Sequence, residues 1–140
     1  MKNYEFKEHT ADIIARAYGN TLEEAFAAAA QAMFDIITGG SEIKAVGKYE
    51  VKAESIDLEG LLVGFLSELI VLHETESVVL DQFQVVFDGD HRLTAVCLGE
   101  SFDPARHGGG TPVKGVSYYL MEIEKGDQGC PCHVQVLFDV

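Results

Sequence analysis

The chain has 140 residues, of which 47% are hydrophobic and 24% are charged. This length and composition predict one domain over residues 1–140 with its own hydrophobic core, and they disfavour a disordered chain. The 23 acidic residues outnumber the 10 basic ones, and the net charge of −13 argues against direct binding to nucleic acid and favours a basic protein partner.

The N-terminus and the cysteines indicate a cytoplasmic protein. The first nine residues are charged from Lys2 onward and contain no apolar stretch. No apolar run approaches the ~20 residues that a membrane span needs, so no membrane contact is expected. The three cysteines are an odd number, which is typical of a reducing compartment.

In the first part of the chain, residues 4–8 alternate apolar and polar side chains, and residues 12–18 form a second strand candidate. Thr21 and Glu24 form a capping-box pattern, and apolar residues follow at helical spacing until two glycines interrupt them. This pattern predicts a helix over residues 21–38.

A third strand is predicted over residues 49–54, and Asp57 is placed to cap a second helix with a wide apolar stripe. The remainder of the chain favours strands near residues 83–87, 93–102, 116–120 and 134–138. We therefore expect an α+β fold in which two helices pack on a mixed, mostly antiparallel sheet in a single compact domain.

Aspartates stand close to both ends of the chain. Asp12 closes the segment His9-Thr10-Ala11-Asp12 between the first two strands, and Asp139 follows the last strand. Asp12 could simply accept bonds from backbone N–H groups in a turn. If the chain ends meet, Asp12, Asp139 and an oxygen of Val140 would instead form the oxygen-only ligand set that hard divalent cations prefer.

Charged residues also surround a segment over residues 103–112. Glu100 precedes it, Arg106 and His107 lie within it, and Lys114 follows where the chain returns to a strand. The segment is either an exposed loop with scattered charges or a concave site on a mobile loop. Its three consecutive glycines lack the phosphate-loop pattern and are interpreted as a source of flexibility.

The run Cys130-Pro131-Cys132-His133 suggests zinc, but structural zinc sites usually need four ligands in paired arrangements. Cys132 and His133 would also point to opposite faces of a strand. A surface turn with free thiols is the favoured interpretation.

In this order, the segments resemble the archease family. The resemblance covers essentially the whole chain, and the ordered set is more specific than any one motif. The matching residues are His9–Asp12, Gly19, Leu22–Phe26, Asp57–Glu59, Leu61–Leu62, Phe65–Leu66, Glu68, Gly99–Glu100, Arg106–His107, Val113–Lys114 and Phe138–Val140.

Archeases are protein cofactors of the RtcB-type RNA ligase that completes tRNA splicing; they promote its guanylylation with GTP and its multiple turnover. The resemblance implies a non-catalytic activator whose divalent metal, Ca²⁺ or else Mg²⁺ or Mn²⁺, is bound by Asp12, Asp139 and Val140. It implies contacts with the ligase or its nucleotide through Lys114, His9, Glu100 and His107.

Two other functions are compatible with the same residues. A metal-dependent phosphoester hydrolase with Asp12, Asp139 and His107 around one ion would turn over substrate without a partner. A structural or chaperone-like acidic module would be indifferent to metal.

Overall fold

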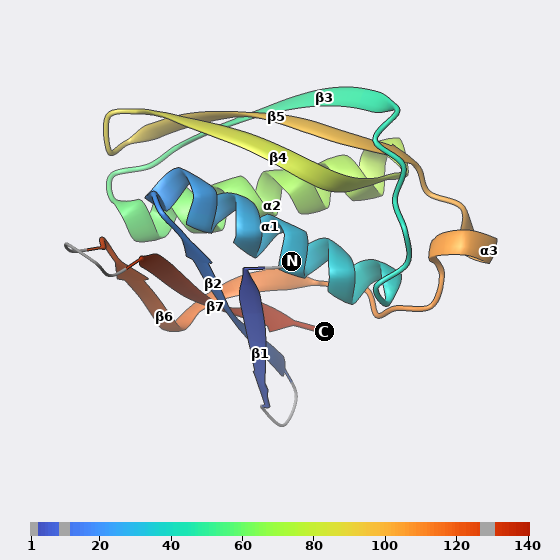
Figure 1. The fold of residues 1–140 in the computed structure, drawn as a ribbon, viewed down its shortest axis with the longest axis horizontal. Helices are drawn as coiled ribbons and strands as arrows, with labels where there is room; N and C mark the ends of the chain where they lie inside the picture. Colours follow the sequence, from blue (N-terminus) through green and yellow to red (C-terminus); the bar gives the residue numbers. More distant parts are fainter. Residues whose placement is uncertain (1–2, 9–11, 127–130) are drawn as a thin grey trace.

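The computed structural model describes residues 3–8, 12–126 and 131–140. Two helices form the middle layer between two antiparallel sheets (Figure 1). The helices are α1 (Leu22–Thr38) and α2 (Leu58–Glu76), and a short helix α3 (Pro104–His107) follows later. One sheet has the order β1 (Tyr4–Glu8), β2 (Asp12–Gly19), β7 (Cys132–Asp139) and β6 (Gly115–Glu124). The other has the order β3 (Gly47–Glu54), β5 (Arg92–Ser101) and β4 (Val78–Asp88).

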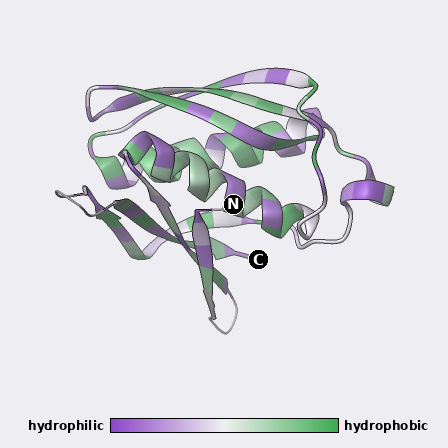
Figure 2. Cartoon of the chain, viewed as in Figure 1, coloured by the Kyte–Doolittle hydropathy of each residue, from purple (hydrophilic) through white to green (hydrophobic). Residues whose placement is uncertain are grey.

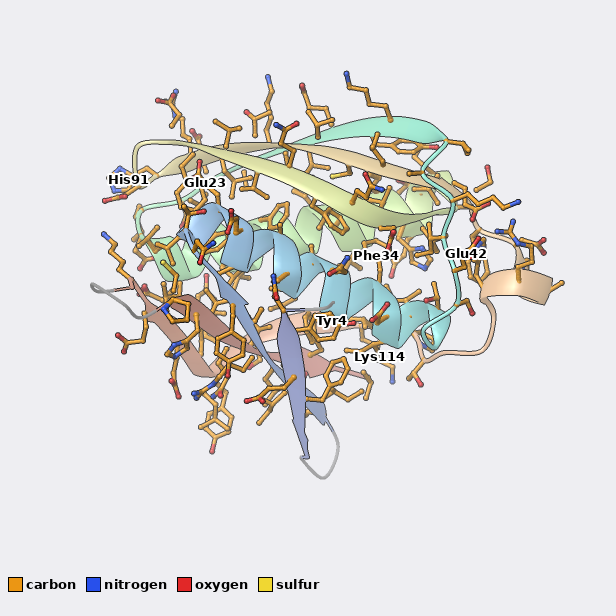
Figure 3. The ribbon with its side chains drawn as sticks, in the orientation of Figure 1. Tyr4, Glu23, Phe34, Glu42, His91 and Lys114 are labelled. Carbon is orange, nitrogen blue, oxygen red and sulfur yellow. The ribbon has the colours of Figure 1, made fainter. Side chains whose placement is uncertain are left out.

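The position of α1 between two sheets follows from its apolar surface, which covers most of its circumference. A helix that is hydrophobic on nearly all sides must be buried on nearly all sides. Phe34, labelled in Figure 3, stacks on Phe83 of β4 with ring centroids 5.9 Å apart. On the opposite side α1 contacts β2, where Ala15 and Ala17 are fully buried. The predicted α+β fold is confirmed. The strands form two sheets, and α1 packs apolar side chains against both of them.

Local sequence signals set the helix starts and the strand faces. Thr21 accepts a hydrogen bond from the Glu24 N–H (3.1 Å), and the Glu24 carboxylate accepts one from the Asn20 N–H (2.9 Å). Asp57 caps α2 by accepting from the Gly60 N–H at 2.7 Å. The strands alternate hydrophobic and hydrophilic residues because one face of each sheet packs on the helices (Figure 2).

No helix in the described part of the chain is long and apolar enough to cross a membrane.

The segment predicted as a flexible loop is docked onto the end of α1. Asp103 caps α3 through the Ala105 N–H (3.0 Å), and Pro104 occupies the first turn of this helix. Farther along, a Cβ added at Gly110 would overlap the backbone at the end of α1, and the Thr111 N–H donates to the Ile36 carbonyl at 2.8 Å. Gly110 therefore serves a close backbone approach, which corrects the interpretation as flexibility.

Candidate metal and partner site

The two aspartates near the chain ends lie directly opposite each other. Strands β2 and β7 pair antiparallel in a register that begins at Asp12↔Asp139 and continues to Gly19↔Cys132. Directly opposed residues have their Cβ atoms about 4.5–5.5 Å apart on the same face of the sheet. The two aspartates are therefore neighbours across the strand pair, as the metal hypothesis requires.

Strand alternation decides which face carries the pair. Val136 and Phe138 of β7 are fully buried between the sheet and the helices. Asp139 follows Phe138, so its side chain projects from the outer face, and the residue is exposed. Asp12 shares that face through the pairing and is half-buried. A cation could therefore reach both carboxylates from solvent.

Strand β6 pairs with the other edge of β7 and brings the backbone of Lys114 to the site. The Lys114 N–H donates to the Asp139 carbonyl at 2.7 Å, and Gly115 is the residue of β6 opposite Asp139. A Cβ added at Gly115 would lie 3.6 Å from Asp139 Oδ2, so the glycine leaves free volume beside that carboxylate. The exposed Lys114, labelled in Figure 3, stands on the segment that leads into β6.

The two facing carboxylates could hold a cation between them. Like charges directly opposite each other across two strands repel, and a shared divalent ion would reverse that repulsion. Two carboxylates are an oxygen-only donor set suited to hard cations. Within residues 3–8, 12–126 and 131–140, no three or more His, Cys, Asp or Glu side chains gather as a metal site. A complete coordination shell therefore needs further oxygens, such as one from Val140.

Glu100 and His107 belong to a second cluster. The buried Glu100 carboxylate accepts two hydrogen bonds from the Arg106 guanidinium (2.9 and 2.7 Å) and one from the Lys44 N–H (2.6 Å). His107 is fully buried, and its Nδ1 accepts from the Asp103 N–H at 2.9 Å. Its proton is therefore on Nε2, which donates to Glu100 at 3.1 Å.

This cluster joins three segments: the end of β5, helix α3 and the chain before β3. The paired hydrogen bonds from Arg106, with the bond from the Lys44 N–H, lower the pKa of Glu100 to about 2. Glu100 is thus ionised at neutral pH and holds α3 against the body of the protein. In this arrangement Arg106 is the exposed member, whereas Glu100 and His107 lie behind it.

Comparison with known proteins identifies the family. Residues 4–140 match the model of the Archease protein family. The chain belongs to the archease family. The archease of Pyrococcus furiosus is 42% identical over 132 residues, covering 92% of this chain and 93% of the relative. The archease of Methanosarcina acetivorans is 42% identical over 139 residues, covering 96% and 95%.

Two solved structures share the archease fold of this chain. The solution structure of Methanobacterium thermoautotrophicum protein 1598 superposes with a TM-score of 0.75, at 32% identity over the full length of both chains. The crystal structure of a Thermotoga maritima archease, described as a possible chaperone, has a TM-score of 0.61. At 20% identity over 96% and 94% of the two chains, this second likeness shows the fold alone.

The structure brings together only part of the predicted set of site residues. Asp12, Asp139 and Lys114 are neighbours, and Val140 follows Asp139 directly. His9 lies outside the described residues. Both ring nitrogens of His107 are engaged in the second cluster, so the hydrolase arrangement that places His107 on the same ion is not formed.

Arg106 and the backbone of Lys44 are contacts that the sequence analysis missed. The start of α3 had a local signal, because Asp103-Pro104 combines a favoured N-cap residue with proline in the first turn. The contact with Lys44 had none, because a loop 56 positions away in the chain supplies it. Predicted contacts of Glu100 and His107 with a partner stay predictions.

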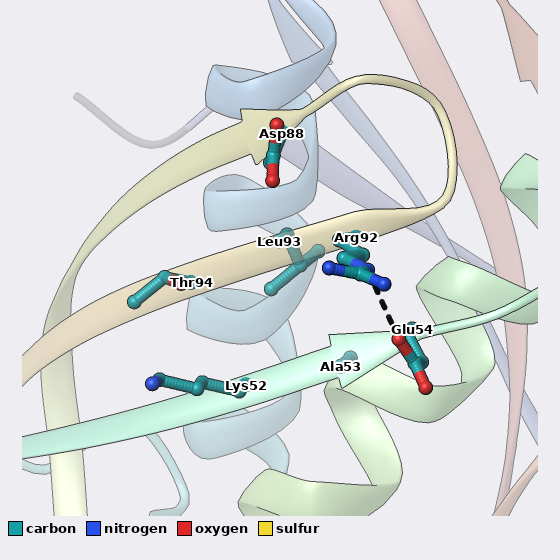
Figure 4. A pocket seen from close by; sticks show the side chains of 7 residues that line it. All are labelled: Lys52, Ala53, Glu54, Asp88, Arg92, Leu93 and Thr94. Atoms are coloured by element: carbon teal, nitrogen blue, oxygen red, sulfur yellow. Dashed lines mark ion pairs between the residues drawn. The ribbon is translucent and has the colours of Figure 1, made fainter.

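Other parts of the surface are less suited to a ligand. A hollow of about 390 Å³ on the three-stranded sheet is lined by two cations, Lys52 and Arg92, and two anions, Glu54 and Asp88 (Figure 4). Arg92 pairs with Glu54 at 3.1 Å, and both side chains are exposed, so the charges balance without a ligand. Cys132 is buried on the helix side of β7 whereas the next residue, His133, faces outward, which disfavours joint zinc binding.

Proposed function

We propose that this archease activates an RtcB-type RNA ligase, promoting its guanylylation with GTP and its multiple turnover without catalysing ligation itself. The observation that carries the proposal is the direct opposition of Asp12 and Asp139 beside the backbone of Lys114. Family membership supports the choice of partner.

In this proposal Asp12 and Asp139 hold a divalent cation, Ca²⁺, Mg²⁺ or Mn²⁺, together with an oxygen of Val140. When bound, the cation would offset the negative charge of the GTP phosphates. Lys114 is positioned by its backbone bond to Asp139, and its ammonium group would contact a phosphate or a ligase carboxylate.

The charge of the chain is consistent with such a partner. An RNA ligase must bind polyanionic RNA and GTP, so the approach to its active site is expected to be cationic. A chain with a net charge of −13 is attracted to that approach and is repelled by free RNA. Direct binding of nucleic acid is therefore not part of the proposed function.

The test measures the guanylylated fraction of the ligase and the number of ligations per ligase molecule. Asp12→Asn, Asp139→Asn and Lys114→Ala should each remove stimulation while far-ultraviolet circular dichroism remains unchanged. Asp88→Asn is the matched control, because Asp88 is also an exposed aspartate at a strand end but lies on the other sheet. Stimulation at the wild-type level by the folded Asp139→Asn variant would refute the site.

The same preparations separate the alternative functions. Hydrolysis of a phosphoester by the purified chain alone would favour a metal-dependent hydrolase. Stimulation of the ligase that does not change when Asp12 and Asp139 are replaced would favour a metal-independent chaperone-like module.

A further inference from the structure

Strand β6 contains a bulge that exposes three consecutive large apolar residues. Its pairing with β7 shifts between Ser117 and Glu122, where the strand changes direction (Figure 1). Within the bulge Tyr118 is 60% exposed, Tyr119 64% and Leu120 43%. Leu120 has a φ of 59°, in the left-handed region that residues with a side chain rarely adopt. We refer to residues 118–120 as the β6 bulge.

Buried and partly buried polar groups hold the β6 bulge in this conformation. Gln135 of β7 is only 7% exposed, and its Nε2 donates to the Leu120 carbonyl at 3.0 Å. The Gln135 Oε1 accepts from Arg16 of β2 (2.9 Å), and Arg16 also binds Glu122 just beyond the bulge (3.2 Å). The Tyr119 N–H donates to the Ser117 hydroxyl at 3.0 Å.

These hydrogen bonds fix the backbone of the β6 bulge in the unbound protein, so its exposed side chains are preorganised for binding. Binding through a preorganised surface loses less conformational entropy than binding through a mobile one. Bulges also occur preferentially near functional sites, where they redirect side chains. A strained residue held by buried partners is consistent with such a role.

The β6 bulge is close to the proposed metal site. Gly115 lies opposite Asp139, and Tyr118 is three residues farther along the same strand, a separation of about 10 Å. A standard protein interface covers about 800 Å² of each partner, equivalent to a circle of about 16 Å radius. A partner centred on Asp139 is therefore wide enough to reach the bulge as well.

We propose that the β6 bulge is the anchor of this interface, inserting its tyrosines and Leu120 into an apolar pocket on a cationic protein surface. The inference rests on the proposed function, because the partner is the same RtcB-type ligase. Tyrosines buried in an interface are among the residues that most often dominate its binding energy. Glu122 and Glu124 follow on the same strand, and with the net charge of −13 they disfavour RNA as the occupant.

Affinity and stimulation are measured separately to test the anchor. Fluorescence anisotropy with the cognate ligase gives Kd, and guanylylation is measured at saturating archease. The variant Tyr118→Ser/Tyr119→Ser should raise Kd about tenfold or more and leave saturated guanylylation unchanged. Asp139→Asn should instead leave Kd unchanged and remove the stimulation of guanylylation at saturating archease. Val86→Ser is the control, because Val86 is a similarly exposed apolar residue (56%) on the other sheet.

A second variant guards against a folding defect. Leu120→Gly removes the exposed side chain at a positive φ that glycine accommodates, so it should be at least as stable as the wild type and still bind more weakly. An unchanged Kd for both bulge variants overturns the anchor while the proposed function stands. No binding by the wild type at any concentration overturns both.

Two further results would assign the bulge to another occupant and overturn the proposal. One is binding of single-stranded RNA by the wild type that is lost in the tyrosine variant. The other is a wild-type dimer in sedimentation that dissociates in the same variant.

Discussion

Replacing Gly110 by alanine tests how the segment before Lys114 is held. The added methyl group would overlap the carbonyl oxygens of Ile36 and Ile37 and the backbone nitrogen of Gly39. These are main-chain atoms at the end of α1, so relief requires a shift of the helix end or of the loop. Overpacking of this kind costs about 1–3 kcal/mol in the free energy of unfolding. For a chain of this length we expect Tm to fall by roughly 3–15 °C.

The adjacent glycine is a matched control. A Cβ added at Gly109 meets nothing closer than the Thr38 carbonyl oxygen, at 3.8 Å, which is an ordinary contact. Gly109→Ala should therefore be neutral or stabilise by up to about 1 kcal/mol, through the smaller freedom of the unfolded chain. Thermal and urea unfolding followed by circular dichroism measure both variants. Equal, small effects at the two positions would refute the docked loop and support the flexible one.

Three other predictions concern metal, acid and thiol chemistry. Calorimetric titration with Ca²⁺ and Mn²⁺ should show binding that Asp139→Asn abolishes and Asp88→Asn retains; equal binding by both variants contradicts the site. Arg106 lowers the pKa of Glu100 from its ordinary value of 4.5 to about 2. The ionised Glu100 therefore stabilises the folded protein fully above pH 4.5, and this contribution to the free energy of unfolding is lost as the pH falls toward 2. Acid titration of the unfolding free energy should therefore be shallower in Glu100→Gln over this range, and identical slopes would exclude the linkage. Burial raises the pKa of the Cys97 thiol to about 12, so mass spectrometry after alkylation near pH 8 should find Cys97 unmodified until urea unfolds the protein.

Structural features that depend on residues close together in the sequence could be predicted from the sequence. Thr21 and Glu24 predicted the start of α1, and Asp57 that of α2, because a cap involves atoms only a few positions apart. The strands were readable because each has one face on the helices and one in water. Helix α3 was readable in principle from Asp103 and Pro104, and it was missed because the following glycines suggested a loop.

The sequence by itself determined that the protein is acidic, that two long helices and several strands form, and that aspartates stand near both ends. Only the tertiary structure decided that Asp12 and Asp139 share one face of one sheet, because strand register depends on packing between segments separated by almost the whole chain. It also decided that His107 is buried beside Glu100 and that Gly110 must remain small. The register, the burial of His107 and the contact at Gly110 all depend on which segments of the chain pack together. The periodicity of side chains along one segment does not specify which other segment packs against it.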